Sequence, residues 1–250
     1  GTFNISTAAA FVVAGAGLCV AKHGNRAASS LCGSADVLKA LGVNVEVSPE
    51  TVGKCLDEVG LGFLFAPALH GAMKYAIGPR RELGIRTIFN ALGPLTNPAG
   101  AQRQVIGVYS EGLTETLAEV LGSLGSERAF VVHGADGLDE LTTTGATRVS
   151  ELVQGSVKTY EVVPEDVGLA VADSNALIGG DEQENADLLL KVLDGEPGPR
   201  QDIVALNAGA AIVAGGLAED FRAGIELARE SILSGKAMEK LEGLKAVSNE

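Results

Sequence analysis

Positively charged residues and cysteines are few in this chain, and tryptophan is absent. The shortage of positive charge and of cysteine excludes several classes of function. The 19 lysines and arginines are outnumbered by 32 aspartates and glutamates, which gives a net charge of −13 at pH 7. Proteins that bind the phosphate backbone of nucleic acids need the opposite balance, so we expect no nucleic-acid partner. The three cysteines, Cys19, Cys32 and Cys55, form no C-x-x-C pair. They predict neither a disulfide framework nor a zinc site, and they favour a reducing, cytoplasmic location.

Charged residues are also missing from positions 1–21, a stretch long enough to raise the question of a membrane span or signal peptide. No basic residue precedes the stretch, and its centre at 8–15 consists mostly of small residues of modest hydrophobicity. Both features favour a buried helix. We therefore expect no membrane association.

Apolar residues, at 46% of the chain, and 33 glycines are plentiful, enough for a substantial core with many tight turns. Apolar runs that alternate with helical patterns are typical of parallel strands joined by crossover helices. The fold class is therefore α/β, with a central mixed, mainly parallel sheet flanked by helices. The expected strands and helices occupy 18–21 (strand), 35–41 (helix, capped by Ser34), a helix from Pro49, 63–66, 104–109 and 128–133 (strands), 113–124 (helix), a hairpin around Gly155, helices over 184–241, and a frayed end at 247–250.

One cluster of positive residues lies in a loop of small residues, KHGNRAASS at 22–30, followed by GSAD at 33–36. Small residues let backbone N–H groups approach an anion, and a helix that begins near Ser34 adds the positive end of its dipole. The loop lacks the P-loop pattern. It predicts a phosphate site, while the alternative is a glycine-serine connector with an incidental Lys22.

An acidic turn follows a predicted strand in the segment VHGADGLDE at 132–140. Its carboxylates are hard oxygen ligands of the kind that bind Mg²⁺ together with substrate phosphates. Taken alone, the turn favours the alternative, an ordinary acidic loop. His133 lacks the partners that a zinc site needs, so we assign it no metal.

A third segment, 80–98, combines arginines with apolar, glycine and proline residues. Arginine can bind a carboxylate through two hydrogen bonds while apolar neighbours line an aromatic pocket. The alternative is a surface helix with ordinary arginines. His70 and Asn207 are interpreted as hydrogen-bonded packing residues.

These elements together resemble the anthranilate phosphoribosyltransferase family. The resemblance covers nearly the whole chain and rests on TFNIST at 2–7, KHGNRAASS, GSADVL, RRELGIRTIFNALGPLTNP and VHGADGLDE. It implies transfer of phosphoribose from phosphoribosyl pyrophosphate (PRPP) to the amine of anthranilate, with Mg²⁺ as cofactor, in tryptophan biosynthesis. Pyrimidine nucleoside phosphorylases share a lysine-histidine-serine loop, but here Gly24 and Asn25 follow His23.

The resemblance also implies which residues bind each ligand. Anthranilate would contact Asn25 and Arg80, and the metal would be held by Ser6, Asp139 and Glu140. No residue is assigned as general acid or base, because the attacking amine is neutral and its lone pair is already available. The residues implied for PRPP are Thr2, Asn4, Ile5, Ser6, Thr7, Lys22, His23, Gly24, Asn25, Arg26, Ala27, Ala28, Ser29, Ser30 and Ser34.

One departure from the family concerns the N-terminus. In the family, a glycine-rich pyrophosphate loop and a helical subdomain precede these motifs, and of that loop only Gly1 is present here. We therefore expect an N-terminally truncated chain whose residues 1–250 form the catalytic α/β domain. Residues 66–97 would pack against the helical subdomain and expose an apolar patch in its absence. The intact protein would be a homodimer; the alternative to catalysis is a remnant that only binds PRPP.

Overall fold

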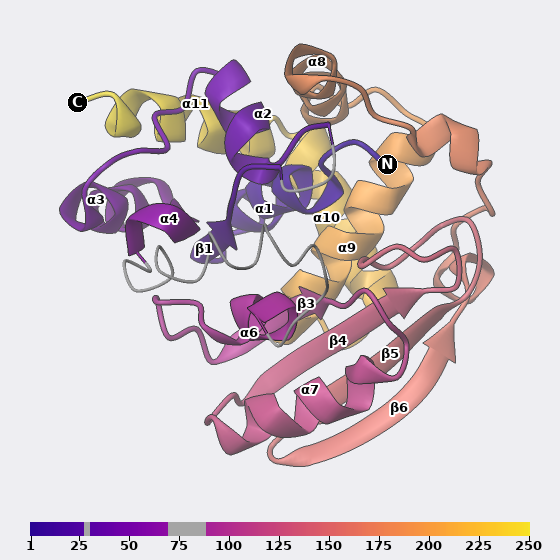
Figure 1. Cartoon of the computed structure of the whole chain (residues 1–250). Helices are drawn as coiled ribbons and strands as arrows, with labels where there is room; N and C mark the ends of the chain where they lie inside the picture. The colour runs from indigo at the N-terminus through magenta and orange to yellow at the C-terminus, as the bar shows by residue number, and fades with distance from the viewer. Residues whose placement is uncertain (28–30, 70–88) are drawn as a thin grey trace.

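A computed structural model describes residues 1–27, 31–69 and 89–250 of the chain, and for 89–91 it describes the backbone only. Helices and strands are interspersed in the first part of the chain, which ends in three consecutive strands, and the remainder is helical (Figure 1). In chain order the elements are α1 (Ile5–Gly15), β1 (Val20–Gly24), α2 (Ser34–Ala40), α3 (Pro49–Val59), β2 (Leu61–Phe65), α4 (Ala66–Leu69), α6 (Phe89–Leu95), β3 (Arg103–Gly107), α7 (Leu113–Ser123), β4 (Arg128–Gly134), β5 (Thr147–Val153), β6 (Ser156–Val162), the 3-10 helices η2 (Pro164–Val167) and η3 (Ser174–Leu177), α8 (Glu182–Leu193), α9 (Pro199–Gly215), α10 (Phe221–Leu233) and α11 (Lys236–Ser248).

The described strands form two groups, with two helices between them. β1 pairs in parallel with β2, and β3 pairs in parallel with β4, whereas β4–β5 and β5–β6 are antiparallel. Helix α1 packs against β1 and β2 and also against α9, which in turn packs against β3 and β4 (Figure 1). The α/β class with mixed strand pairing and flanking helices is therefore confirmed. Within the described residues, however, the strands form a two-stranded and a four-stranded sheet and not one central sheet.

Helix α1 is the centre of the larger hydrophobic core. Residues 7–15 are all buried, and the side chains of Phe11 and Val12 are at most 1% exposed. This burial explains the absence of charge from 7–15, because an ionised side chain would be costly there. The expected buried helix is confirmed. No helix in the described ranges has the length and apolar character needed to cross a bilayer.

Local signals placed several helix ends correctly. The Ser48 hydroxyl accepts a hydrogen bond from the Thr51 N–H at 3.3 Å, and Pro49 is the first residue of α3. Gly42 and Gly60 have positive φ angles of 90° and 79° where α2 and α3 end. Such angles suit glycine, which has no Cβ to clash. The hairpin around Gly155 is also confirmed.

Two of the expected helix ends were wrong. Ser34 is the first residue of α2 rather than its cap, and Gly33 holds the cap position with its N–H bound to the Asp36 carboxylate at 2.9 Å. The C-terminal residues do not fray: α11 continues to Ser248, whose hydroxyl accepts the Asn44 N–H at 3.1 Å. Val247 and Ser248 are buried. Tertiary packing therefore stabilises the last turn of α11, which we expected from the sequence to be frayed.

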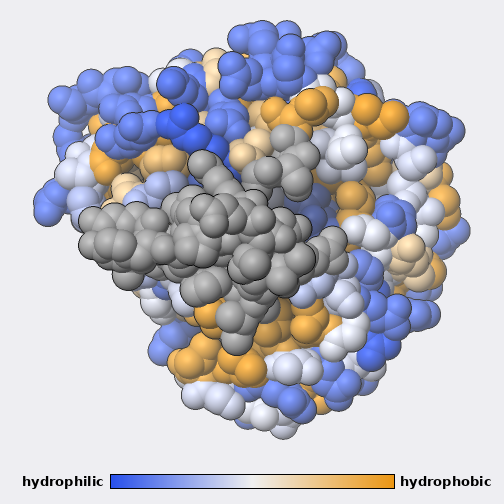
Figure 2. Space-filling view, in the orientation of Figure 1, coloured by the Kyte–Doolittle hydropathy of each residue, from blue (hydrophilic) through white to orange (hydrophobic). Residues whose placement is uncertain are grey.

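The surface shows where this packing leaves polar and apolar side chains. Hydrophilic residues dominate the upper edge of the view, over α2 and α11, while hydrophobic residues gather lower down (Figure 2). The apolar patch expected over 66–97 falls largely on residues 70–88, outside the described part of the chain. It stays a prediction.

Helices α9 and α10 cross so closely that one glycine substitution should be costly. A Cβ on Gly224 would lie 2.4 Å from the Gly209 carbonyl oxygen of α9, whereas a Cβ on Gly53 of α3 would meet nothing within 4 Å. We expect Gly224→Ala to lower the free energy of unfolding by about 1–3 kcal/mol through overpacking. Gly53→Ala should raise it by about 0.5–1 kcal/mol, because alanine is the better helix former. Urea denaturation of both variants measures these two changes in the free energy of unfolding. Changes of the same sign would contradict the close crossing of α9 and α10.

Candidate functional site

Three segments that are distant in the sequence meet at the start of α1. Lys22, in β1, donates from Nζ to the Ser6 hydroxyl oxygen at 3.3 Å. The Ser6 N–H donates to Glu140 Oε1 at 3.0 Å, from the first turn of α1 to the loop after β4. The first N–H groups of a helix have no partner within the helix, so an anionic carboxylate is favoured at this position. A lysine, a hydroxyl and a carboxylate are thereby connected at one place.

The protein surroundings alter the ionisation of Glu140 and Lys22. Partial burial and the neighbouring Asp139 carboxylate raise the pKa of Glu140 to about 7, against the opposing effects of Lys22 and Ser6. Burial also lowers the pKa of Lys22, although Glu140 and Asp139 act in the opposite direction. Desolvation disfavours both charged forms, and the two adjacent carboxylates repel one another. A cation placed between the carboxylates would relieve this repulsion.

The loop that carries Asp139 and Glu140 is held in shape by Asp136. Its carboxylate accepts hydrogen bonds from the hydroxyls of Thr142 and Thr144, both at 2.6 Å, and from the Leu138 N–H at 3.1 Å. Burial opposes the ionisation of Asp136, but these hydrogen bonds outweigh it and lower its pKa. Asp136 is therefore occupied in organising the turn, while Asp139, which is exposed, and the partly buried Glu140 are left for a ligand.

The end of β3 approaches the same loop. A Cβ on Gly107 would lie 1.4 Å from the Asp139 carbonyl oxygen, so any other residue at 107 would displace the Asp139 backbone. Glycine at this position therefore lets the acidic loop lie directly against the strand.

The loop at 22–34 is organised by a residue that sequence reasoning missed. Asp36, in α2, accepts hydrogen bonds from the N–H groups of both Ala27 and Gly33 at 2.9 Å. The Ala35 N–H donates to the Asn25 carbonyl oxygen at 3.1 Å. These bonds bring the two ends of the loop together. The signal in the sequence was an aspartate three residues after Gly33, which is where a helix-capping carboxylate lies.

Two other polar residues of this loop, Asn25 and Arg26, already have partners. The Arg26 guanidinium pairs with Glu46 and lies over the Phe65 ring, 5.6 Å from the ring centroid. The Asn25 side-chain oxygen accepts the Arg26 N–H at 2.7 Å. His23 and Gly24 belong to β1, opposite Leu64 and Phe65 of β2, and not to the loop itself. Binding of a phosphate by Arg26 would require it to leave Glu46.

Residues at the N-terminus contribute to the site unequally. Asn4 exchanges hydrogen bonds with Cys32, from its amide to the Cys32 carbonyl oxygen and from the Cys32 thiol to its own oxygen, both at 3.4 Å. Thr2 lies further away, in a β-bridge with Ile178. The side chains of Ile5 and Thr7 are 0% and 1% exposed, so only their backbone N–H groups could face a ligand, and the Ile5 N–H already donates to the Phe3 carbonyl oxygen at 2.9 Å.

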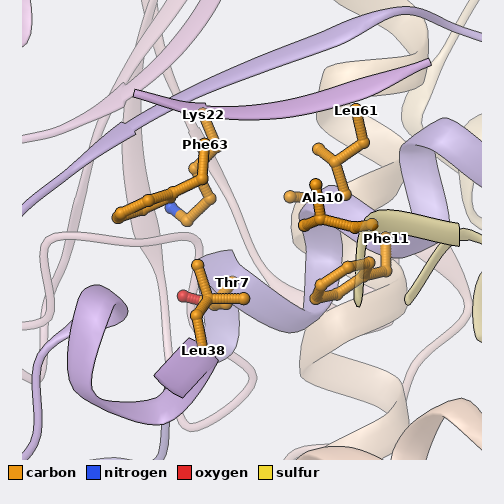
Figure 3. A pocket seen from close by; sticks show the side chains of 8 residues that line it. Thr7, Ala10, Phe11, Lys22, Leu38, Leu61 and Phe63 are labelled. Atoms are coloured by element: carbon orange, nitrogen blue, oxygen red, sulfur yellow. The ribbon is translucent and has the colours of Figure 1, made fainter. Parts of the chain in front are cut away.

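Thr7 faces a small internal cavity next to Lys22. The cavity has a volume of about 10 Å³ and lies between α1 and the strand pair. Figure 3 shows Lys22 beside the Phe63 ring, with Thr7 below them. The buried Thr7 hydroxyl has no hydrogen-bond partner among the residues that the structure describes. The cavity is at the lower size limit for one water molecule, and its exposed wall is apolar, so it does not offer the two or more polar partners that a buried water needs.

Several predicted ligand-binding residues lie outside the described part of the chain. These are Ala28, Ser29 and Ser30 of the loop, and Arg80, the expected partner of the anthranilate carboxylate. The structure brings Ser6, Lys22 and Glu140 together, and places Asp139 next to Glu140.

The oxygen atoms at this junction suit Mg²⁺. Two carboxylates and a serine hydroxyl are hard oxygen donors, and Mg²⁺ is typically held by one or two carboxylates together with substrate phosphates. Within the described residues, no group of three or more histidines, cysteines, aspartates and glutamates could hold a metal by itself, so substrate phosphates would have to complete the coordination. His133 is bound through Nδ1 to the Val108 carbonyl oxygen at 2.7 Å.

The profile of the glycosyl transferase family, a/b domain, matches residues 1–238. Anthranilate phosphoribosyltransferase of Moorella thermoacetica is 58% identical over 245 residues, covering 98% of this chain and 72% of the relative. The enzyme of Symbiobacterium thermophilum is 59% identical, again covering 98% and 72%. The chain belongs to the anthranilate phosphoribosyltransferase family. It spans about 72% of the length of these curated relatives.

Solved anthranilate phosphoribosyltransferases have the same fold. The crystal structure of the enzyme from Thermus thermophilus superposes with a TM-score of 0.95 at 49% identity, covering 100% of this chain and 74% of that one. The enzyme from Saccharomyces cerevisiae in complex with PRPP and Mg superposes with a TM-score of 0.91 at 33% identity, covering 99% and 70%. Another structure of the yeast enzyme contains 4-fluoroanthranilate. The family expected from the sequence motifs is confirmed.

Removing the Glu140 charge should stabilise the metal-free protein at high pH. The Glu140 pKa of about 7 lies above the ordinary value of 4.5, so ionisation of this carboxyl costs more in the folded protein than in the unfolded chain and destabilises the fold at high pH. We expect Glu140→Gln to raise the free energy of unfolding at pH 8 by about 1 kcal/mol, allowing for partial exposure. The gain should shrink as the pH falls through 7 and become small by pH 4.5, below which wild-type Glu140 is protonated in both the folded and the unfolded state.

Chemical denaturation between pH 4.5 and 8.5 measures this difference. Glu115→Gln, on the exposed face of α7, is the matched control and should show no such pH-dependent gain. Addition of Mg²⁺ with PRPP should stabilise the wild type more than Glu140→Gln. A Glu140→Gln profile parallel to that of the wild type would refute the environment assigned to this carboxylate.

Proposed function

We propose that this chain forms the catalytic domain of an anthranilate phosphoribosyltransferase. It transfers the phosphoribosyl group of PRPP to the amine of anthranilate, giving N-(5-phosphoribosyl)anthranilate and pyrophosphate, a step of tryptophan biosynthesis. The observation that carries this proposal is the junction of Ser6, Lys22 and Glu140 in a fold shared with enzymes solved with PRPP, Mg and 4-fluoroanthranilate.

In this proposal the diphosphate of PRPP binds where the start of α1 meets the end of β1. Asp139, Glu140 and Ser6 hold Mg²⁺, which neutralises charge on the departing pyrophosphate. Lys22 adds a fixed positive charge beside Ser6, and the Thr7 N–H supplies a donor at the helix start. The Ile5 N–H joins it on leaving the Phe3 carbonyl oxygen, to which it donates at 2.9 Å. The loop at 22–30 with Ser34, together with Thr2 and Asn4, surrounds the rest of the PRPP molecule.

Displacement at the anomeric carbon passes through a transition state with oxocarbenium character, so stabilising the leaving group is the main task of the site. The amine of anthranilate attacks with a lone pair that is already free. Positioning therefore contributes more than proton abstraction, and we assign no general base. Asn25 and Arg80 would orient anthranilate, with Arg80 binding its carboxylate.

The domain boundaries and assembly belong to the same proposal. Residues 1–250 act as one catalytic domain, and 66–97 pack against a helical subdomain that also provides the dimer contact. The working enzyme is a cytoplasmic homodimer with no nucleic-acid or membrane partner.

Anthranilate fluorescence provides the direct test. The protein that carries this chain should consume anthranilate only when PRPP and Mg²⁺ are both present, and the chain has no tryptophan to add background. Lys22→Met should lower kcat/KM for PRPP by about 100- to 1,000-fold, the usual cost of one preorganised donor at a developing charge. Lys39→Met, on the exposed face of α2, should leave turnover unchanged. Phosphate-dependent release of a base would instead indicate a nucleoside phosphorylase, and PRPP binding without turnover a non-catalytic remnant.

The role of Arg80 can be tested separately. Arg80→Ala should raise the KM for anthranilate by about tenfold or more and change the KM for PRPP much less, because only anthranilate loses its carboxylate partner. Steady-state kinetics with each substrate varied in turn measures the difference. An equal rise in both values would contradict the assigned contact.

A further inference from the structure

Asn207 lies in the middle of α9, and its amide contacts the backbone of the acidic loop. The Leu141 N–H donates to Asn207 Oδ1 at 3.0 Å, and Asn207 Nδ2 donates to the Leu141 carbonyl oxygen at 2.8 Å. A further bond runs from Nδ2 to the Ile203 carbonyl oxygen at 2.9 Å, within α9. Both amide hydrogens and the amide oxygen are thus used. The orientation of the amide is fixed, because reversing it would place donors against the Leu141 N–H and an oxygen against two carbonyl groups.

Leu141 directly follows Glu140, so the two hydrogen bonds from Asn207 restrain the backbone beside this carboxylate. The N–H of Leu141 belongs to the peptide that joins it to Glu140, so holding this N–H fixes the plane of that peptide. Leu141 lies between β4 and β5, outside their ladder, and within the described residues no other backbone bond to it is present. Asn207 is 7% exposed and Leu141 is 0% exposed. Water therefore offers little substitute for the amide.

The Glu140 side chain is restrained at its other end by a different helix. Its carboxylate accepts the Ser6 N–H of α1, and α1 packs directly against α9. Asp139 and Glu140 repel one another, so they need a rigid support to remain side by side without a cation. The backbone bonds from α9 and the side-chain bond from α1 supply that support from two packed helices.

We propose that Asn207 is a positioning residue for the Asp139–Glu140 carboxylate pair: by pairing with both backbone groups of Leu141, it holds the two carboxylates in the arrangement that receives Mg²⁺ together with PRPP. The inference rests on the proposed function and deepens it. Asn207 contacts no reacting atom. It acts through the backbone of the loop, as residues behind metal ligands commonly do.

The test compares two variants of Asn207 with a control elsewhere in the core. Asn207→Leu keeps a similar volume without polar atoms, and Asn207→Ser is smaller and cannot reach both backbone groups. Ser231→Ala is the matched control, because it removes a buried hydrogen bond from α10 to the Val12 carbonyl oxygen at 2.8 Å, away from the acidic loop. Calorimetric titration with PRPP at a fixed, subsaturating Mg²⁺ concentration measures binding without turnover.

We expect both Asn207 variants to weaken PRPP binding in the presence of Mg²⁺ by about 10- to 100-fold, while the KM for anthranilate changes less than about threefold. Ser231→Ala should bind PRPP like the wild type. Hydrogen exchange followed by NMR should show faster exchange of the Leu141 amide in both Asn207 variants. Leucine has no acceptor for this N–H, and the shorter serine side chain does not reach it. If Asn207→Leu does not fold, Asn207→Ser gives the same comparison.

Unchanged Mg²⁺-dependent PRPP binding in folded Asn207 variants would overturn the inference and leave Asn207 as a packing residue. Equal weakening by Ser231→Ala would also overturn it, because general destabilisation would then explain the effect. The proposed function fails differently: a wild-type protein that consumes no anthranilate with PRPP and Mg²⁺ refutes that function, whatever the Asn207 variants do.

Discussion

Holding two neighbouring carboxylates together beside a lysine is the constraint on which the rest of this site depends. Asp139 and Glu140 repel one another, and Glu140 has lost part of its water, so its pKa rises to about 7. The hydrogen bond from the Ser6 N–H to Glu140, and Lys22 next to Ser6, offset part of this repulsion and desolvation. Such an arrangement is unfavourable when empty and favourable when a divalent cation and an anionic diphosphate enter together. Binding of the metal and binding of the substrate are therefore coupled by charge.

The layered packing of helices and strands makes this junction possible. Helix α1, buried on nearly all sides, places its first turn against the end of β1 and against the loop after β4. Helix α9 lies between α1 and the β3–β6 strands. A single buried helix pair thus connects the lysine-bearing strand to the carboxylate-bearing loop. Displacement of either helix would separate groups that must act on one ligand.

The few positive charges near the site matter because the chain as a whole is acidic. A net charge of −13 repels an anionic substrate at long range, so local cations and helix N–H groups have to provide the attraction. Lys22 does so at the junction. Arg26, in contrast, pairs with Glu46 and lies over Phe65. Its availability to a phosphate depends on breaking that pair, which lies on the surface and is therefore weak.

The sequence alone determined the family, the α/β class, the buried N-terminal helix and most helix and strand positions. These follow from short-range patterns: apolar periodicity, Ser48 followed by Pro49, glycines at positive φ, and motifs of consecutive residues such as KHGNRAASS and VHGADGLDE. The tertiary structure alone decided that Asp36 closes the phosphate loop, that Thr7 faces inward, that the C-terminus is packed, and that Asn207 holds the backbone beside Glu140. Each of these depends on contacts between residues far apart in the chain or on the direction of a side chain. Residue type and spacing do not specify such contacts, because they form only when the packed helices bring the segments together.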